Sequence, residues 1–154
     1  MTVLSPSLFS VSEVELVYRS KVTATDRPMI RNSANAFDVF LNMWDMNKIE
    51  MVEQFAVLLL NRSNYCLGYS CINTGGISEC LVDPKIVFAT ALKANATSII
   101  VAHNHPSGNT APSKADTALT DRLVSIGRTM TIPVSDHLII TPTRYFSFSN
   151  EGLL

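Results

Sequence analysis

A short apolar run, a loop with two histidines and a long amphipathic helix follow one another between residues 97 and 130. The run over residues 97–103 is short and nearly all apolar, which predicts a central strand. Ser113 predicts the start of a helix that ends near Met130, because serine is a favoured N-cap. The apolar residues of this helix recur at helical spacing: Ala115, Leu119, Leu123, Ile126 and Met130. A central strand followed by such a helix restricts the fold to a sheet layered with helices.

The rest of the chain alternates between strand and helix patterns. Ser33 or Asn35 is the predicted cap of a helix that runs to about Met46, and Pro84 is the predicted start of a second helix. Strands are predicted over residues 13–23, 54–61, 65–72, 132–141 and 144–149, with a turn at residues 61–64 that makes the second and third of them a hairpin. This order predicts an α/β (α+β) fold with a mixed sheet.

The composition fits one compact domain. The chain has 154 residues, of which 47% are hydrophobic and 16% charged, so it can bury a core. No apolar run reaches the roughly 20 residues of a membrane span, and the start of the chain does not resemble a secretory signal, so we expect a cytoplasmic protein. The formal net charge is −1. A dedicated duplex-DNA binder has a basic excess, so the charge does not support DNA as a partner, although a local basic patch stays open.

The cysteines do not form a recognisable metal or disulfide pattern. Cys66, Cys71 and Cys80 are odd in number, and no two of them have CxxC spacing. We expect them to be free thiols that pack as small apolar residues, with a zinc or redox role as the alternative.

His103 and His105 end the predicted central strand two residues apart, so both side chains can point to the same side of it. Pro106 favours an extended conformation of His105, which helps the two imidazoles meet at one ion. Asp116 is the third candidate ligand, because a helix that begins beside the strand would return its carboxylate to the histidines. Two nitrogens and one oxygen leave a fourth zinc position open for water, as catalytic sites do.

Each of these residues also has an ordinary structural alternative. A loop histidine is more often a hydrogen-bonding residue than a ligand, and Asp116 follows Ser113 in an S-x-x-D capping pattern. The string His103-Asn104-His105 does not indicate an HNH nuclease, whose three letters name residues far apart in sequence.

The combined pattern H-x-H-P-x6-S-x-x-D, from His103 to Asp116, resembles the JAMM (MPN+/JAB) metalloprotease motif. The longer string HNHPSG…PS..D, together with DPKIVFATALKANATSIIVAHNHPSG, DHLII and the ending EGLL, resembles the RadC-like branch over roughly residues 30–154. The resemblance implies a cytidine-deaminase-like three-layer sandwich, with residues 31–154 as the JAB/MPN domain and residues 1–30 as an N-terminal extension.

The resemblance also implies the roles of particular residues. His103, His105 and Asp116 would hold one Zn²⁺ per chain, and Ser113 would stabilise an oxyanion. Glu53 would act as general acid and base, in preference to Glu50, because it directly precedes a predicted strand. For Glu53 the alternative is a surface carboxylate at a strand end. The implied function is a zinc-dependent hydrolase of a peptide or isopeptide amide, with a peptide or protein as its unidentified substrate.

Some features depart from the branch or leave alternatives. Nothing in the first 30 residues resembles the N-terminal helix-hairpin-helix region of RadC-like proteins, and DPK at residues 83–85 replaces the branch's HPR. The missing region weakens the DNA-repair role that the branch's name implies. That name and the lack of a substrate signal still make a non-enzymatic metal-binding module in DNA repair or mobile-element biology the alternative function. A deaminase is not supported, because its H-x-E…P-C-x-x-C pattern is missing. His137 could orient a ligand or serve the core alone. Exposed strand edges would allow a homodimer.

Overall fold

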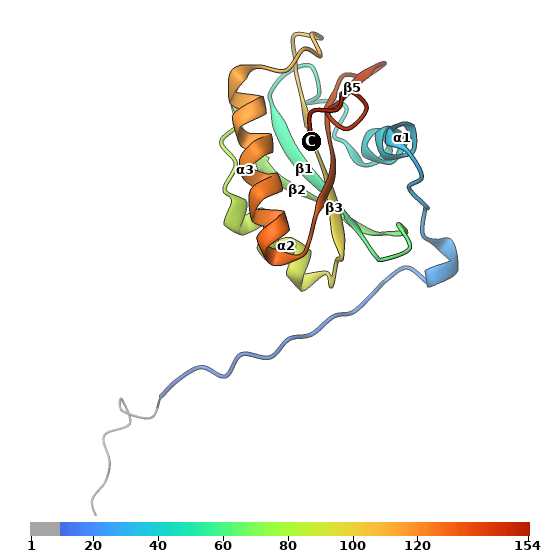
Figure 1. Ribbon diagram of the computed structural model, residues 1–154, viewed down its shortest axis with the longest axis vertical. Coiled ribbons are helices and arrows are strands. Elements are labelled where there is room, and N and C mark those ends of the chain that lie inside the picture. Colours follow the sequence, from blue (N-terminus) through green and yellow to red (C-terminus); the bar gives the residue numbers. More distant parts are fainter. Residues whose placement is uncertain (1–9) are drawn as a thin grey trace, which may run out of the picture.

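The computed structural model describes residues 10–154, which are organised around one five-stranded mixed sheet (Figure 1). The strands are β1 (Gln54–Leu60), β2 (Cys66–Thr74), β3 (Ser98–Asn104), β4 (Val134–Ile140) and β5 (Tyr145–Ser147). Their order across the sheet is β2-β1-β3-β4-β5. Only β3 and β4 run parallel, because the helix between them carries the chain back to the same end of the sheet.

Helices cover both faces of the sheet. Helix α1 (Ser33–Met43) lies on one face, and α2 (Pro84–Lys93) and α3 (Lys114–Met130) lie on the other (Figure 1). Alternate residues of β1 therefore enter two separate cores, with Ala56 and Leu58 on the α1 side and Phe55 and Val57 on the other. This arrangement explains why all residues of β1 and of β3 are buried. The predicted fold class, a three-layer α/β (α+β) sandwich with a mixed sheet, is confirmed.

Most predicted elements are present, with shifted ends. The hairpin is confirmed as the antiparallel pair β1–β2. The first helix is capped by Asn32, whose side chain accepts from the Asn35 amide at 2.9 Å, rather than by Ser33 or Asn35. It ends at Met43 and not at Met46, because the Asp45 side chain accepts a hydrogen bond from the Asn47 amide. This bond favours a turn over residues 45–47.

The strand predicted over residues 13–23 is wrong. These residues are exposed, and none of them pairs with a strand of the described chain. Alternation of apolar and polar residues is not enough for a strand, which needs a hydrogen-bonded neighbour. The chain first meets the sheet at Met29, which pairs with Tyr65 just before β2, after a 3-10 turn at Ala24–Asp26.

The connection from β3 to α3 positions the candidate site. The strand ends at Asn104, and α3 begins ten residues later at Lys114, on the face where the His103 side chain meets Asp116 of this helix. Within residues 10–154 no helix combines the length and the apolar character needed to span a bilayer.

Candidate metal centre and its cleft

The side chains of His103, His105 and Asp116 meet at one point. The two Nε2 atoms are 3.0 Å apart, and Nε2 of His103 lies 3.1 Å from Oδ1 of Asp116. Nε2 of His105 lies 3.4 Å from Oδ2 of the same carboxylate. Zinc bonds of 2.0–2.1 Å in a tetrahedron place neighbouring ligand atoms about 3.3 Å apart. The three residues that the sequence predicts are therefore brought together at the spacing a small metal ion requires, in the only group of its kind within the described residues.

The start of α3 brings Asp116 back toward the strand. The Ser113 side chain accepts from the Asp116 amide at 3.1 Å, and Oδ2 of Asp116 accepts from the Ser113 amide at 2.7 Å. This reciprocal pair is a capping box. The capping and metal-binding interpretations of Asp116 are compatible, because Oδ2 caps the helix while Oδ1 faces His103.

A chain of hydrogen bonds behind His103 assigns its tautomer. The Thr120 hydroxyl donates to the Asp116 carbonyl at 2.7 Å, so it must accept from Nδ1 of His137, also at 2.7 Å. The unprotonated Nε2 of His137 then accepts from Nδ1 of His103 at 2.8 Å. His103 consequently presents a bare Nε2 lone pair to Asp116 and His105.

His105 is oriented in the same way by the loop. Its Nδ1 donates to the Asn109 carbonyl at 2.6 Å, which leaves the Nε2 lone pair of the neutral ring directed at His103 and Asp116. Two lone pairs and a carboxylate thus face one another with no proton available between them. Such a donor set is unfavourable without a cation, and its nitrogen and oxygen atoms suit zinc. The residues therefore fit the metal that the resemblance implies.

The pKa values at the site reflect this arrangement. Burial alone would raise the pKa of Asp116. Hydrogen bonds that His103 and His105 donate when their Nε2 atoms are protonated outweigh burial and hold the pKa well below its usual range. The hydrogen bond to Asp116 is the main reason that the pKa of His105 is raised. Complete burial keeps the pKa of His137 far below its ordinary value, so this ring is neutral, as the hydrogen-bond chain requires.

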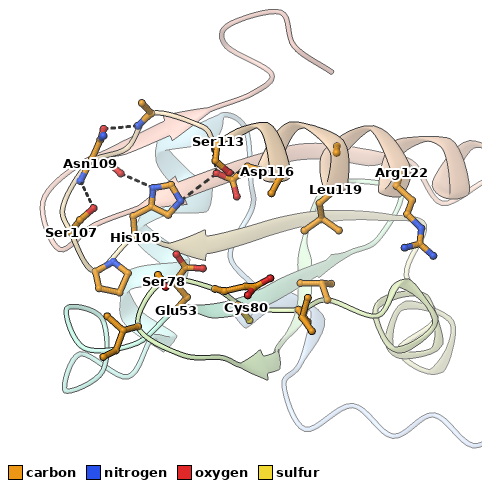
Figure 2. Close-up of a pocket in the computed structure, with 18 residues that line it drawn as sticks. Glu53, Ser78, Cys80, His105, Ser107, Asn109, Ser113, Asp116, Leu119 and Arg122 are labelled. Atoms are coloured by element: carbon orange, nitrogen blue, oxygen red, sulfur yellow. Dashed lines mark hydrogen bonds and ion pairs between the residues drawn. The ribbon is translucent and has the colours of Figure 1, made fainter.

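Glu53 lies across a cleft of about 700 Å³ from His105 and Asp116 (Figure 2). It directly precedes β1, where its amide donates to the Gly76 carbonyl and its carbonyl accepts from the Gly75 amide, both at 2.8 Å. Burial raises the pKa of the Glu53 carboxyl, while the nearby histidines oppose the shift. We call His103, His105 and Asp116 the metal-binding group, as the candidate ligands of one ion. The glutamate that the sequence indicates lies in the same cleft as His105 and Asp116 of this group.

Ser113 also lines this cleft. Its oxygen accepts the Asp116 amide, and its hydroxyl proton has no acceptor among the described residues. That proton can be donated to a group bound in the cleft. The predicted serine therefore caps α3 and lines the cleft as well.

Two supporting residues, Thr120 and Asn104, were not predicted from the sequence. Thr120 forms the hydrogen-bond chain behind His103 together with His137, for which the sequence left open whether it orients a ligand or serves only the core. Asn104 is fully buried on the opposite side of β3, where it donates to the carbonyls of Ile49 and Val52 and accepts from the Gln54 amide. Asn104 thereby fixes the segment that contains Glu53. A buried asparagine between two ligands was the available signal, since a buried amide must find partners.

The cleft continues along α3, away from the metal-binding group. One wall presents small and apolar residues of α3 and ends at Arg122, and the other is the loop over residues 77–82 (Figure 2). Cys80 lies in this loop, and all three cysteines are free as predicted.

Comparisons with known proteins agree with this geometry. Residues 30–153 match the family of the RadC-like JAB domain. A UPF0758 protein of Symbiobacterium thermophilum is 45% identical over 103 residues, which are 67% of this chain and 44% of that protein. A UPF0758 protein of Flavobacterium johnsoniae is 36% identical over 143 residues, 93% of this chain and 62% of the relative. UPF0758 protein YfjY of Escherichia coli K12 is 39% identical over 137 residues, which cover 86% of this chain and 85% of YfjY.

The chain spans less than two thirds of the first two relatives and most of YfjY. The matched region includes Glu53, Ser113 and all three residues of the metal-binding group. Family, fold and site geometry lead to the same conclusion: the chain belongs to the family of RadC-like JAB domain proteins.

Proposed function

We propose that this chain is a zinc-dependent hydrolase of the JAMM type that cleaves a peptide or isopeptide amide bond. The proposal is carried by one observation: unprotonated nitrogens of His103 and His105 meet the Asp116 carboxylate at the wall of a cleft that also holds Glu53. A zinc ion bound there would supply a Lewis acid and make water nucleophilic near neutral pH.

The proton transfers would fall to Glu53. Its half-buried carboxylate lies in the cleft, where it can accept a proton from the attacking water and pass it to the leaving amine. The raised pKa of this carboxyl supports that role, because a group with a pKa nearer to neutral exchanges protons more readily in both directions. Ser113 would donate its free hydroxyl proton to the oxygen that becomes negative as the amide carbonyl is attacked.

The test begins with the metal. Elemental analysis of the wild-type protein and of His103→Ala, purified side by side, should find about one zinc per chain in the first and little in the second. Glu53→Gln should keep the zinc, because Glu53 is not part of the group that holds it. Hydrolysis of a peptide library by Glu53→Gln should fall by about 10²–10⁴-fold, measured as new N-termini by mass spectrometry.

Two results would argue against the proposal. Wild-type protein that takes up no zinc when it is supplied would remove the metal site. Full hydrolysis by Glu53→Gln would remove the proposed acid and base. Stoichiometric zinc without hydrolysis of any amide would favour the alternative, a non-enzymatic metal-binding module in DNA repair or mobile-element biology.

A further inference from the structure

The first described segment of the chain exposes an unusual number of large apolar side chains. We call residues 10–23 the N-terminal arm. Val11, Val14 and Leu16 of this arm are 87%, 85% and 94% exposed, and Val17, Tyr18 and Val22 are about half exposed. Exposed apolar residues that cluster in this way mark an interaction site more often than a solvated surface.

The arm has the pattern of a strand with one buried face. Val14, Leu16 and Tyr18 alternate with Glu13, Glu15 and Arg19, and the polar face is interrupted by Val11 and Val17. The backbone is extended, but it projects away from the sheet (Figure 1). Val14 and Leu16 are almost fully exposed, so no other described segment covers this part of the apolar face. The arm is therefore built for a neighbour that its own sheet does not supply.

An open sheet edge of matching kind lies on β2. This strand is at the edge of the sheet and pairs only with β1. Tyr65, which directly precedes β2, pairs with Met29. The amide of Cys66, the first residue of β2, donates to the Pro28 carbonyl at 2.8 Å. The turn at Ala24–Asp26 then directs the chain away from this edge. Over residues 67–72 the outer side of β2 has no backbone partner in the described structure, and such an edge is a template for another strand.

An aromatic cluster with partly exposed neighbours lies beside this edge. On the α1 side, Tyr69 of β2 packs against Phe40 and Trp44 in an aromatic cluster. The Trp44 indole N–H is buried without a hydrogen-bond acceptor in the described part of the molecule, which is unusual for tryptophan. Met43 and Met46, which flank Trp44 in sequence, are each about half exposed. A strand added to β2 would extend the sheet beside this cluster and offer an apolar face to it.

We propose that the N-terminal arm of a second copy adds to the free edge of β2 as a sixth strand, and that the exchange is reciprocal. Each copy would then supply the one strand that the other lacks, which closes the assembly as a symmetric dimer. The charges of the arm permit this self-association, because Glu13 and Glu15 are balanced by Arg19 and Lys21. The proposal is independent of any hydrolytic activity.

Light scattering on the full chain, coupled to size exclusion, tests the proposal with a matched pair of variants. Wild-type protein should have twice the mass of one chain. Leu16→Asp places a charge on the apolar face of the arm and should halve that mass. Val17→Asp makes the same change at the next residue, on the opposite face, and should leave the mass of the dimer unchanged.

Hydrogen exchange identifies where the arm binds. The amides of residues 67–72 that point outward should exchange slowly in the wild type and faster in Leu16→Asp, while those of β3 should not change. A wild-type protein that is monomeric at every concentration would overturn the proposal. So would a dimer that survives Leu16→Asp, because its interface would then lie elsewhere, for example between two copies of β2.

Discussion

The two walls of the cleft are held in different ways. The wall of β3 and α3, which contains the metal-binding group, is fixed by the capping box at Ser113 and by buried hydrogen bonds of His103, His137 and Thr120. The opposite wall, the loop over residues 77–82, exposes the large side chains of Ile77 and Leu81, with 79% and 76% of their surface accessible.

The loop wall depends on one close backbone approach. Gly75 lies against the Glu79 carbonyl and the Cys80 backbone so closely that a Cβ atom would clash with both. The Gly76 amide also donates to the Glu79 carbonyl at 2.8 Å. One wall is thus held by buried side-chain hydrogen bonds, and the other by a close contact of its backbone.

The largest expected effect is loss of the metal from the wall of β3 and α3. Asp116→Asn removes the carboxylate charge and should reduce zinc from about one per chain to near none, measured by elemental analysis. Asp121→Asn, the same change on an exposed part of α3, is the control and should keep its zinc. If Asp116→Asn retains stoichiometric zinc, the assignment of this wall as the metal site is wrong.

A smaller effect is expected when the hydrogen-bond chain behind His103 is broken. Thr120→Val removes the oxygen that accepts from Nδ1 of His137, so the tautomer of His103 is no longer fixed. Zinc affinity, measured by competition with a chelator, should fall about 10–100-fold. Thr117→Val is the matched control, because Thr117 is exposed on the same helix. Equal zinc affinities for the two variants would mean that the hydrogen-bond chain serves only the core.

The next prediction concerns the loop wall and its contact with the segment of Glu53. Gly75→Ala forces the loop away from the Cys80 backbone, and overpacking of this kind costs about 1–3 kcal/mol of unfolding free energy. Amide hydrolysis should weaken, because the loop lines the cleft and the Gly75 amide also donates to the Glu53 carbonyl, while zinc affinity stays unchanged. Gly76→Ala is the control, since its Cβ would meet only the Glu79 carbonyl at 3.9 Å. A loss of zinc in Gly75→Ala would show that the two walls are not independent.

The smallest effect is the pH dependence of zinc binding. A proton and zinc compete for the same lone pair of His105, and hydrogen bonding to Asp116 raises the pKa of this imidazole in the metal-free protein. Since the pKa is raised, protonation should weaken zinc binding at pH values above the usual histidine range near 6.5. Chelator competition between about pH 6 and pH 8 should therefore find affinity rising with pH. Affinity that stays constant over this interval would contradict the shifted pKa.

Much of the site could be predicted because its signals are local in sequence. His103 near the end of β3 and His105 just beyond it are two residues apart, and Ser113 and Asp116 belong to one helix cap. These spacings determine which side chains share a face. The strand predicted over residues 13–23 is wrong for the opposite reason. The sequence pattern indicates a strand, but strand pairing depends on a distant partner.

The supporting hydrogen bonds could not be predicted, because they join residues that are remote along the chain. Nothing in a single sequence shows that Asn104 holds the segment before Glu53, or that His137 contacts both His103 and Thr120. Such partners are determined by strand order and by the side of the sheet on which each helix lies.

The sequence by itself determined the candidate metal ligands, the order of the elements from α1 to β5 and the family expectation, because periodicity and capping act over a few residues. The tertiary structure decided the tautomer that His103 presents, the position of Glu53 across the cleft and the open edge beside β2. Those features depend on burial and on hydrogen bonds across the sheet, and both arise only when distant segments pack together.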